Sequence, residues 1–101
     1  MSITFCVEAH SEAEEDALAS EHAPTLNLHN TGGCTLLAVL GIDLDRYGTI
    51  DAADLLARID TGPVGPIPEH PGLDYVVARL PRLREVAVAA HRLGRQVVVW
   101  G

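Results

Sequence analysis

Residues 30–60 read NTGGCTLLAVLGIDLDRYGTIDAADLLARID, and this pattern predicts two helices joined by an acidic loop. Large apolar side chains recur at helical spacing on both sides of the loop, so each helix has one face to bury. These residues are Leu36, Leu37 and Leu40 in the first helix and Leu55, Leu56 and Ile59 in the second. The rest of the chain must provide a surface against which the two helices pack.

The ends of these helices carry local stop and start signals. Gly41 can adopt the left-handed backbone conformation that terminates a helix, with Ile42 folding back over the last turn. Asp51 can cap the second helix by accepting a hydrogen bond from the backbone N–H of Asp54. Asp54 stands four residues before Arg58, which is the spacing of a helical ion pair. This interpretation requires no metal ion.

The loop also partially resembles the calcium-binding loop of EF-hand proteins. The carboxylates that this resemblance places at ligand positions are Asp43, Asp45, Asp51 and Asp54. Gly48 stands where the EF-hand loop turns sharply, but Tyr47 occupies a position that needs a short Asp or Asn. Asp54 replaces the longer glutamate of calcium sites, which would favour magnesium. A calcium or magnesium site is therefore the alternative prediction, and a protein without a cofactor is the preferred one.

The composition predicts a single domain, residues 1–101. Of its residues 48% are hydrophobic, which is enough for one buried core. No apolar run approaches the roughly 20 residues of a membrane span, and the acidic N-terminus lacks the basic start of a signal peptide. We therefore expect a cytoplasmic protein that does not bind membranes, with Cys6 and Cys34 as reduced thiols.

Charge is distributed unevenly along the chain. Residues 1–45 contain eight acidic residues and no Arg or Lys, whereas residues 46–101 contain seven arginines and six acidic residues. A strongly negative half argues against nucleic-acid binding, because attraction to phosphates supplies most of the non-specific affinity. It favours a protein partner with a basic surface.

Residues 11–22, SEAEEDALASEH, form the acidic segment. Its composition and the potential cap at Ser11 fit either a short exposed helix or a mobile loop. We predict that this segment is mobile in the isolated protein. Either this segment or the Pro/Gly-rich loop 61–72 is expected to form the interaction surface. The carboxylates of the predicted surface are Glu12, Glu14, Glu15 and Asp16. They could contact arginines of the same chain, arginines of a second copy in a homo-oligomer, or a basic partner.

The two termini predict strands. Residues 2–9 alternate between apolar and polar, and the β-branched run 96–100 is expected to pair with them. A further short strand is expected at 25–29. The predicted fold class is α+β, with a small sheet formed by the terminal strands and packed against about three helices. The helices are expected near residues 33–40, 51–60 and 73–93.

The last of these helices contains a proline and most of the arginines. Its apolar stripe continues through Pro81, so this residue either kinks one helix or starts a second. The stripe consists of Leu73, Val76, Val77, Leu80, Leu83, Ala87 and Ala90. Five arginines lie between residues 79 and 95, on the other faces of the helix and just beyond it, and Gly94 is expected to end the helix.

Cys34 is the residue most compatible with enzymatic chemistry. It lies in the first turn of the helix that Asn30 or Thr31 is expected to cap, five residues after His29. A helix N-terminus lowers the pKa of a thiol, so a Cys-dependent enzyme is a third prediction. No third residue that would orient His29 is identifiable.

The chain from residue 27 onward resembles small uncharacterised proteins of bacteria and their phages. The resemblance lies in the run Asn27, Leu28, His29 and Asn30, in Leu36, Leu37, Leu40, Gly41 and Ile42, in Gly48 with Ile50, in Tyr75, Arg79 and Leu80, and in the ending Trp100-Gly101. It implies no particular activity. The favoured prediction is a small acidic protein-interaction or regulatory module that is not an enzyme.

Overall fold

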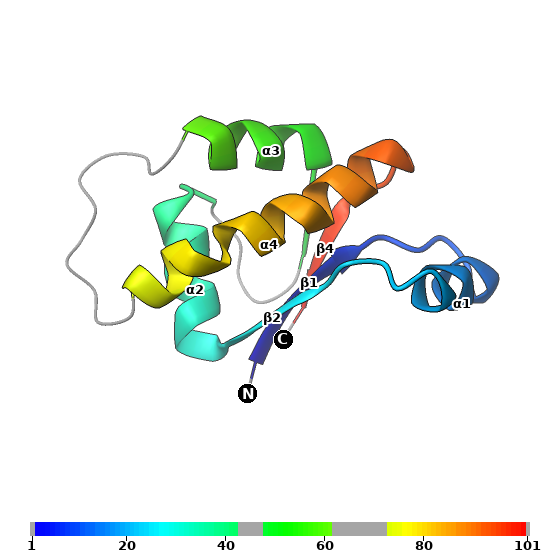
Figure 1. Ribbon diagram of the computed structural model, residues 1–101, viewed down its shortest axis with the longest axis horizontal. Coiled ribbons are helices and arrows are strands. Elements are labelled where there is room, and N and C mark those ends of the chain that lie inside the picture. The colour runs from blue at the N-terminus through cyan, green and yellow to red at the C-terminus, as the bar shows by residue number, and fades with distance from the viewer. Residues whose placement is uncertain (1, 43–47, 62–72, 101) are drawn as a thin grey trace.

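The structure, a computed structural model, describes residues 2–42, 48–61 and 73–100 (Figure 1). Within these ranges it contains four strands and four helices. In chain order the elements are β1 (Ser2–Val7), α1 (Glu12–Ser20), β2 (Leu26–His29), α2 (Asn30–Val39), β3 (Gly48–Ile50), α3 (Ala52–Thr61), α4 (Leu73–Arg92) and β4 (Val97–Trp100).

The four strands form one antiparallel sheet in the order β2-β1-β4-β3. The two terminal strands lie at its centre, with Thr4 opposite Trp100 and Val7 opposite Val97. This confirms the predicted pairing of the termini. The edge strand β3 was not predicted, because its three residues are too few to show an alternating pattern and were assigned to the acidic loop. Its pairing with β4 is set by tertiary contact.

Helices α2, α3 and α4 cover one face of the sheet and form the core with it (Figure 1). The strands contribute every second residue to this core, as their pleat requires. These residues are Ile3, Phe5, Val7, Leu26, Leu28, Ile50, Val97 and Val99. The predicted α+β class, a small sheet packed against helices, is therefore confirmed.

The predicted end of α2 and the predicted start of α3 are confirmed. Gly41 has a φ of 68°, and the N–H of Ile42 donates to the carbonyl of Leu37 at 2.9 Å. The backbone N–H of Asp54 donates to Oδ2 of Asp51 at 3.0 Å. One contact goes beyond the prediction, because Arg58 donates to Asp54 and also to the carbonyl oxygens of Leu40 and Gly41. Its guanidinium thereby fastens α3 to the C-terminal end of α2 and satisfies carbonyls that the helix leaves unpaired.

The predicted start of α2 was wrong. The helix begins at Asn30, and its N-cap is His29, whose side chain makes no capping hydrogen bond. The reason is that β2 leads directly into α2 without a loop, so Asn30 is already helical and cannot act as the cap.

Helix α4 is a single helix that contains Pro81. Proline removes the hydrogen bond to the carbonyl four residues earlier, here that of Val77. Both Pro81 and Val77 lie on the exposed side of α4, where water can hydrate that carbonyl. Val77 had been placed in the buried stripe and is instead 44% exposed, whereas Val86 is fully buried. Val77 directly follows the buried Val76, and neighbouring helical residues point about 100° apart.

Candidate interaction surface

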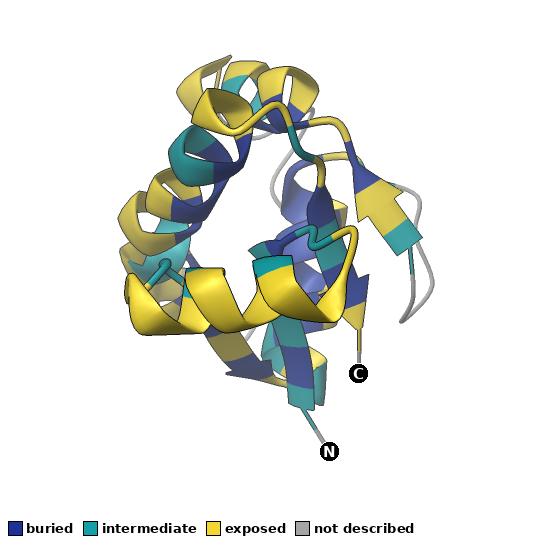
Figure 2. Ribbon diagram, turned by 90° about the vertical axis from the view of Figure 1, so that its right-hand side faces the viewer, coloured by how far each residue is buried: buried dark blue, intermediate teal, exposed yellow. Residues whose placement is uncertain are grey.

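The acidic segment forms the short exposed helix α1, which is one of the two alternatives predicted for it, and its mobility in the isolated protein stays a prediction. Ser11 caps it, with Oγ accepting a hydrogen bond from the N–H of Glu14 at 3.2 Å. None of its residues is buried, and Figure 2 shows the helix almost entirely exposed. Figure 1 shows it beyond one end of the sheet, away from α2, α3 and α4. Helix α1 is thus held by few contacts and presents most of its surface to solvent.

Glu14 forms the ion pair that fastens α1 to the rest of the chain, in addition to the packing of Leu18 against the core. Its carboxylate accepts two hydrogen bonds from Arg95, at 2.5 and 2.9 Å. Arg95 follows Gly94, whose φ of 66° ends α4, and its N–H donates to the carbonyl of Ala90. The hydrogen bonds from Arg95 lower the pKa of Glu14 below its ordinary value. Among the four predicted surface carboxylates, Glu14 therefore serves an intramolecular contact.

The other predicted surface carboxylates, Glu12, Glu15 and Asp16, are exposed. The arginines of α4 do not neutralise them. Arg84 forms an ion pair with Asp60, and Arg82 forms one with Glu85. In the described part of the chain, the contact between Glu14 and Arg95 is the only ion pair between α1 and an arginine.

The sheet face opposite the helices, which we call the open face, has a polar half and an apolar half. In the polar half, Asn27 donates to Ser2 Oγ at 3.1 Å and to Thr4 Oγ1 at 2.8 Å. The apolar half consists of Cys6, Val98 and Trp100, whose positions follow from the register of β1 and β4. Trp100 is 51% exposed. An exposed tryptophan beside other apolar side chains is typical of binding surfaces.

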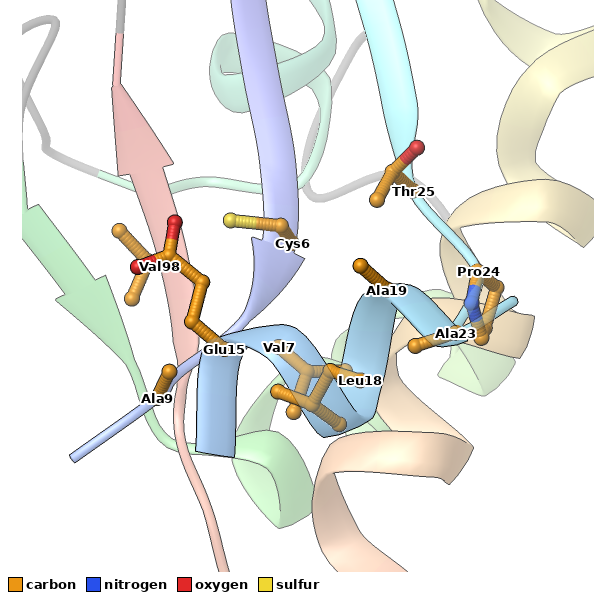
Figure 3. A pocket seen from close by; sticks show the side chains of 10 residues that line it. All are labelled: Cys6, Val7, Ala9, Glu15, Leu18, Ala19, Ala23, Pro24, Thr25 and Val98. Atoms are coloured by element: carbon orange, nitrogen blue, oxygen red, sulfur yellow. The ribbon is translucent and has the colours of Figure 1, made fainter. Parts of the chain in front are cut away.

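A groove lies between α1 and the sheet and has a volume of about 380 Å³ (Figure 3). Its lining is mostly apolar and comes from α1, β1, β4 and the segments that join α1 to β1 and β2. The lining residues are Cys6, Val7, Ala9, Glu15, Leu18, Ala19, Ala23, Pro24, Thr25 and Val98. Because Cys6 and Val98 also belong to the open face, the groove and the apolar half of that face are continuous.

The groove also explains the state of the Cys6 thiol. Burial raises its pKa, a hydrogen bond with the Trp100 side chain partly opposes this, and the nearby carboxylate of Glu15 adds to the increase. A thiol with a raised pKa is mostly protonated near neutral pH and is a weak nucleophile. Cys6 therefore acts in the groove as a small apolar side chain.

Sequence reasoning missed the groove and the apolar half of the open face. A signal for them exists in residues 97–100, where all four side chains are apolar. A strand with one solvated face should alternate with polar residues. The apolar Val98 and Trp100 thus indicate that the second face of β4 also has something to contact.

The two carboxylates of the predicted metal loop that the structure describes have protein partners. Asp51 caps α3, and Asp54 pairs with Arg58 at 3.1 Å. Asp43 and Asp45 lie outside the described residues. Within residues 2–42, 48–61 and 73–100, no three His, Cys, Asp or Glu side chains gather as a metal site would require. The described contacts thus follow the capping interpretation of Asp51 and Asp54.

The predicted Cys34 and His29 pair gains no support from geometry. Cys34 is exposed on α2, and His29 is exposed at its N-cap. The described residues include no hydrogen bond between the two side chains. Of the predicted loop 61–72, only Thr61 is described, and it ends α3.

No family model matches this chain, and neither curated proteins nor solved structures match it significantly. None of the described helices combines the length and the apolar character that crossing a membrane requires.

Proposed function

We propose that this protein is a non-enzymatic interaction module that binds a protein partner through the acidic surface of α1. The observation that carries the proposal is that α1 has no buried residue and yet is held to the rest of the chain by the contact of Glu14 with Arg95 and by the partly buried Leu18. Helices of globular domains are normally stabilised by burying an apolar face. A fixed but unburied helix with exposed carboxylates is suited to contact with another molecule.

The charge of the surface defines the partner that it would bind. Glu12, Glu15 and Asp16 are exposed on a chain with a net charge of −7. A partner with a basic surface would be attracted over roughly the Debye length, which is about 8 Å at physiological ionic strength. Such attraction mainly accelerates association and selects among partners. Binding should therefore weaken as the salt concentration rises.

The test is a triple variant, Glu12→Gln, Glu15→Gln and Asp16→Asn, which leaves Glu14 and its contact with Arg95 intact. The matched control replaces three exposed acidic residues on α3 and α4: Asp60→Asn, Asp74→Asn and Glu85→Gln. Both variants change the net charge from −7 to −4, since −7 + 3 = −4. Proteins captured from a native lysate would be compared for the wild type and both variants over a range of salt concentrations.

We expect the control to retain the salt-sensitive partners and the α1 variant to lose them. If the α1 variant keeps the same partners with the same salt dependence, its carboxylates only solubilise the protein. If both variants lose the partners equally, the effect belongs to the net charge and not to α1.

A further inference from the structure

The groove between α1 and the sheet differs from the acidic surface beside it in its chemistry. Its floor and walls are formed mainly by aliphatic side chains, among them Val7, Leu18 and Val98. Small-molecule sites usually combine an apolar lining with several convergent polar groups. Here the polar groups are few: the Glu15 carboxylate, the Cys6 thiol and the Thr25 hydroxyl. This lining suits an apolar side chain better than a polar metabolite.

The charge around the groove limits which apolar segment would bind. Glu15 lines the groove itself, and Glu12 and Asp16 are exposed on the same helix. Among the described residues that line the groove there is no arginine, and the chain contains no lysine. An apolar segment flanked by acidic residues would be repelled, whereas one flanked by lysine or arginine would place opposite charges along α1.

The open face extends the groove toward Trp100. Cys6 connects the two, since it lines the groove and lies on the same face of the sheet as Trp100, opposite Val98. A bound segment that runs from the groove across Cys6 would therefore cover part of the indole ring. Aromatic side chains in such positions commonly supply much of the binding energy at interfaces.

We infer that the groove and the apolar half of the open face bind a partner segment in which apolar side chains are flanked by lysine or arginine. This inference rests on the proposed function and adds to it the requirement for an apolar anchor. Charge alone accounts for attraction to α1, whereas the anchor decides where the segment binds.

Three short synthetic peptides without tryptophan test the inference: alternating leucine and arginine, alternating serine and arginine, and alternating leucine and glutamate. Alternation places the leucines of an extended peptide on one face. Trp100 is the only tryptophan of the chain, so its fluorescence reports binding directly. We expect the leucine–arginine peptide to bind at least about tenfold more tightly than the serine–arginine peptide, because burying a leucine side chain contributes about that factor or more.

Two alanines of α1 provide a matched pair of variants. Ala19 lines the groove, whereas Ala17 is exposed and is not among the lining residues. Ala19→Phe should fill the groove and weaken the leucine–arginine peptide about tenfold, and Ala17→Phe should leave its affinity unchanged. Neither change alters the charge or a buried residue, and thermal unfolding would verify that both variants fold.

The outcomes separate the two proposals. Equal binding of the two arginine peptides would overturn the inference and leave the proposed function standing. Failure of both to bind would overturn both proposals, as would equal binding of the leucine–glutamate and leucine–arginine peptides. Equal weakening by Ala17→Phe and Ala19→Phe would show that the segment does not bind in the groove.

Discussion

Replacing Gly33 by alanine tests how closely α2 lies against the sheet. A Cβ atom at residue 33 would lie 2.7 Å from Cβ of Ile3 and 2.8 Å from its Cδ1. Ile3 is fully buried in the central strand β1, so neither its Cβ nor the strand can move away without disturbing the core. Gly32, one residue earlier, is a matched control, because a Cβ there would meet Tyr75 at an ordinary 3.7 Å.

The two variants share the effect of replacing glycine by alanine in a helix, a gain of about 0.5–1 kcal/mol. Gly33→Ala adds overpacking of the core, which typically costs about 1–3 kcal/mol. The difference in the free energy of unfolding between the two variants therefore reports only the contact of residue 33 with Ile3, and it should be about 1–3 kcal/mol. For a domain of this size, each kcal/mol corresponds to a change in melting temperature of about 4–8 °C.

Urea unfolding monitored by circular dichroism measures the free energy of unfolding of both variants, and calorimetry measures their melting temperatures. We expect Gly32→Ala to be at least as stable as the wild type and Gly33→Ala to be the less stable of the two. If Gly33→Ala matched or exceeded the stability of Gly32→Ala, the close approach of α2 to β1 would be refuted.

Three further predictions concern the local contacts. Asp51→Ala should destabilise the protein by about 0.5–2 kcal/mol in EDTA, whereas Asp51→Asn should destabilise it much less because asparagine retains a hydrogen-bond acceptor. Equal urea midpoints for the wild type and Asp51→Ala would contradict the capping role of Asp51. Removal of divalent metal ions with EDTA should leave the protein folded. In a separate measurement, a melting temperature that does not change in millimolar calcium or magnesium would exclude metal binding by residues 43–54. Arg95 lowers the pKa of Glu14 in the folded state. The contact therefore stabilises the protein fully at pH values above the unfolded-state pKa of about 4.3. This stabilisation is lost as the pH falls through the lower pKa of the folded state. Glu14→Gln should accordingly lower the urea midpoint at neutral pH, and a loss that persisted at acid pH would have another cause.

The sequence by itself determined the features that depend on neighbouring residues. The alternation of Ile3, Phe5 and Val7 identified the buried face of β1. The stop at Gly41 and the cap at Asp51 were also predictable, because each motif is completed within a few residues. The α+β class followed from the same local patterns, since the only partner for one apolar strand face was the set of apolar helix faces.

Tertiary structure alone decided which distant residues meet. Strand β3 exists because β4 offers it hydrogen-bonding partners, and the ion pair of Glu14 with Arg95 joins residues far apart in the chain. The guanidinium of Arg58 reaches the end of α2 for the same reason. The candidate site followed this division: exposed carboxylates were visible in the sequence, but the groove was not. Its mostly apolar lining comes from residues 6–9, 15–19, 23–25 and 98, and only the packing of α1 against the end of the sheet brings these stretches together.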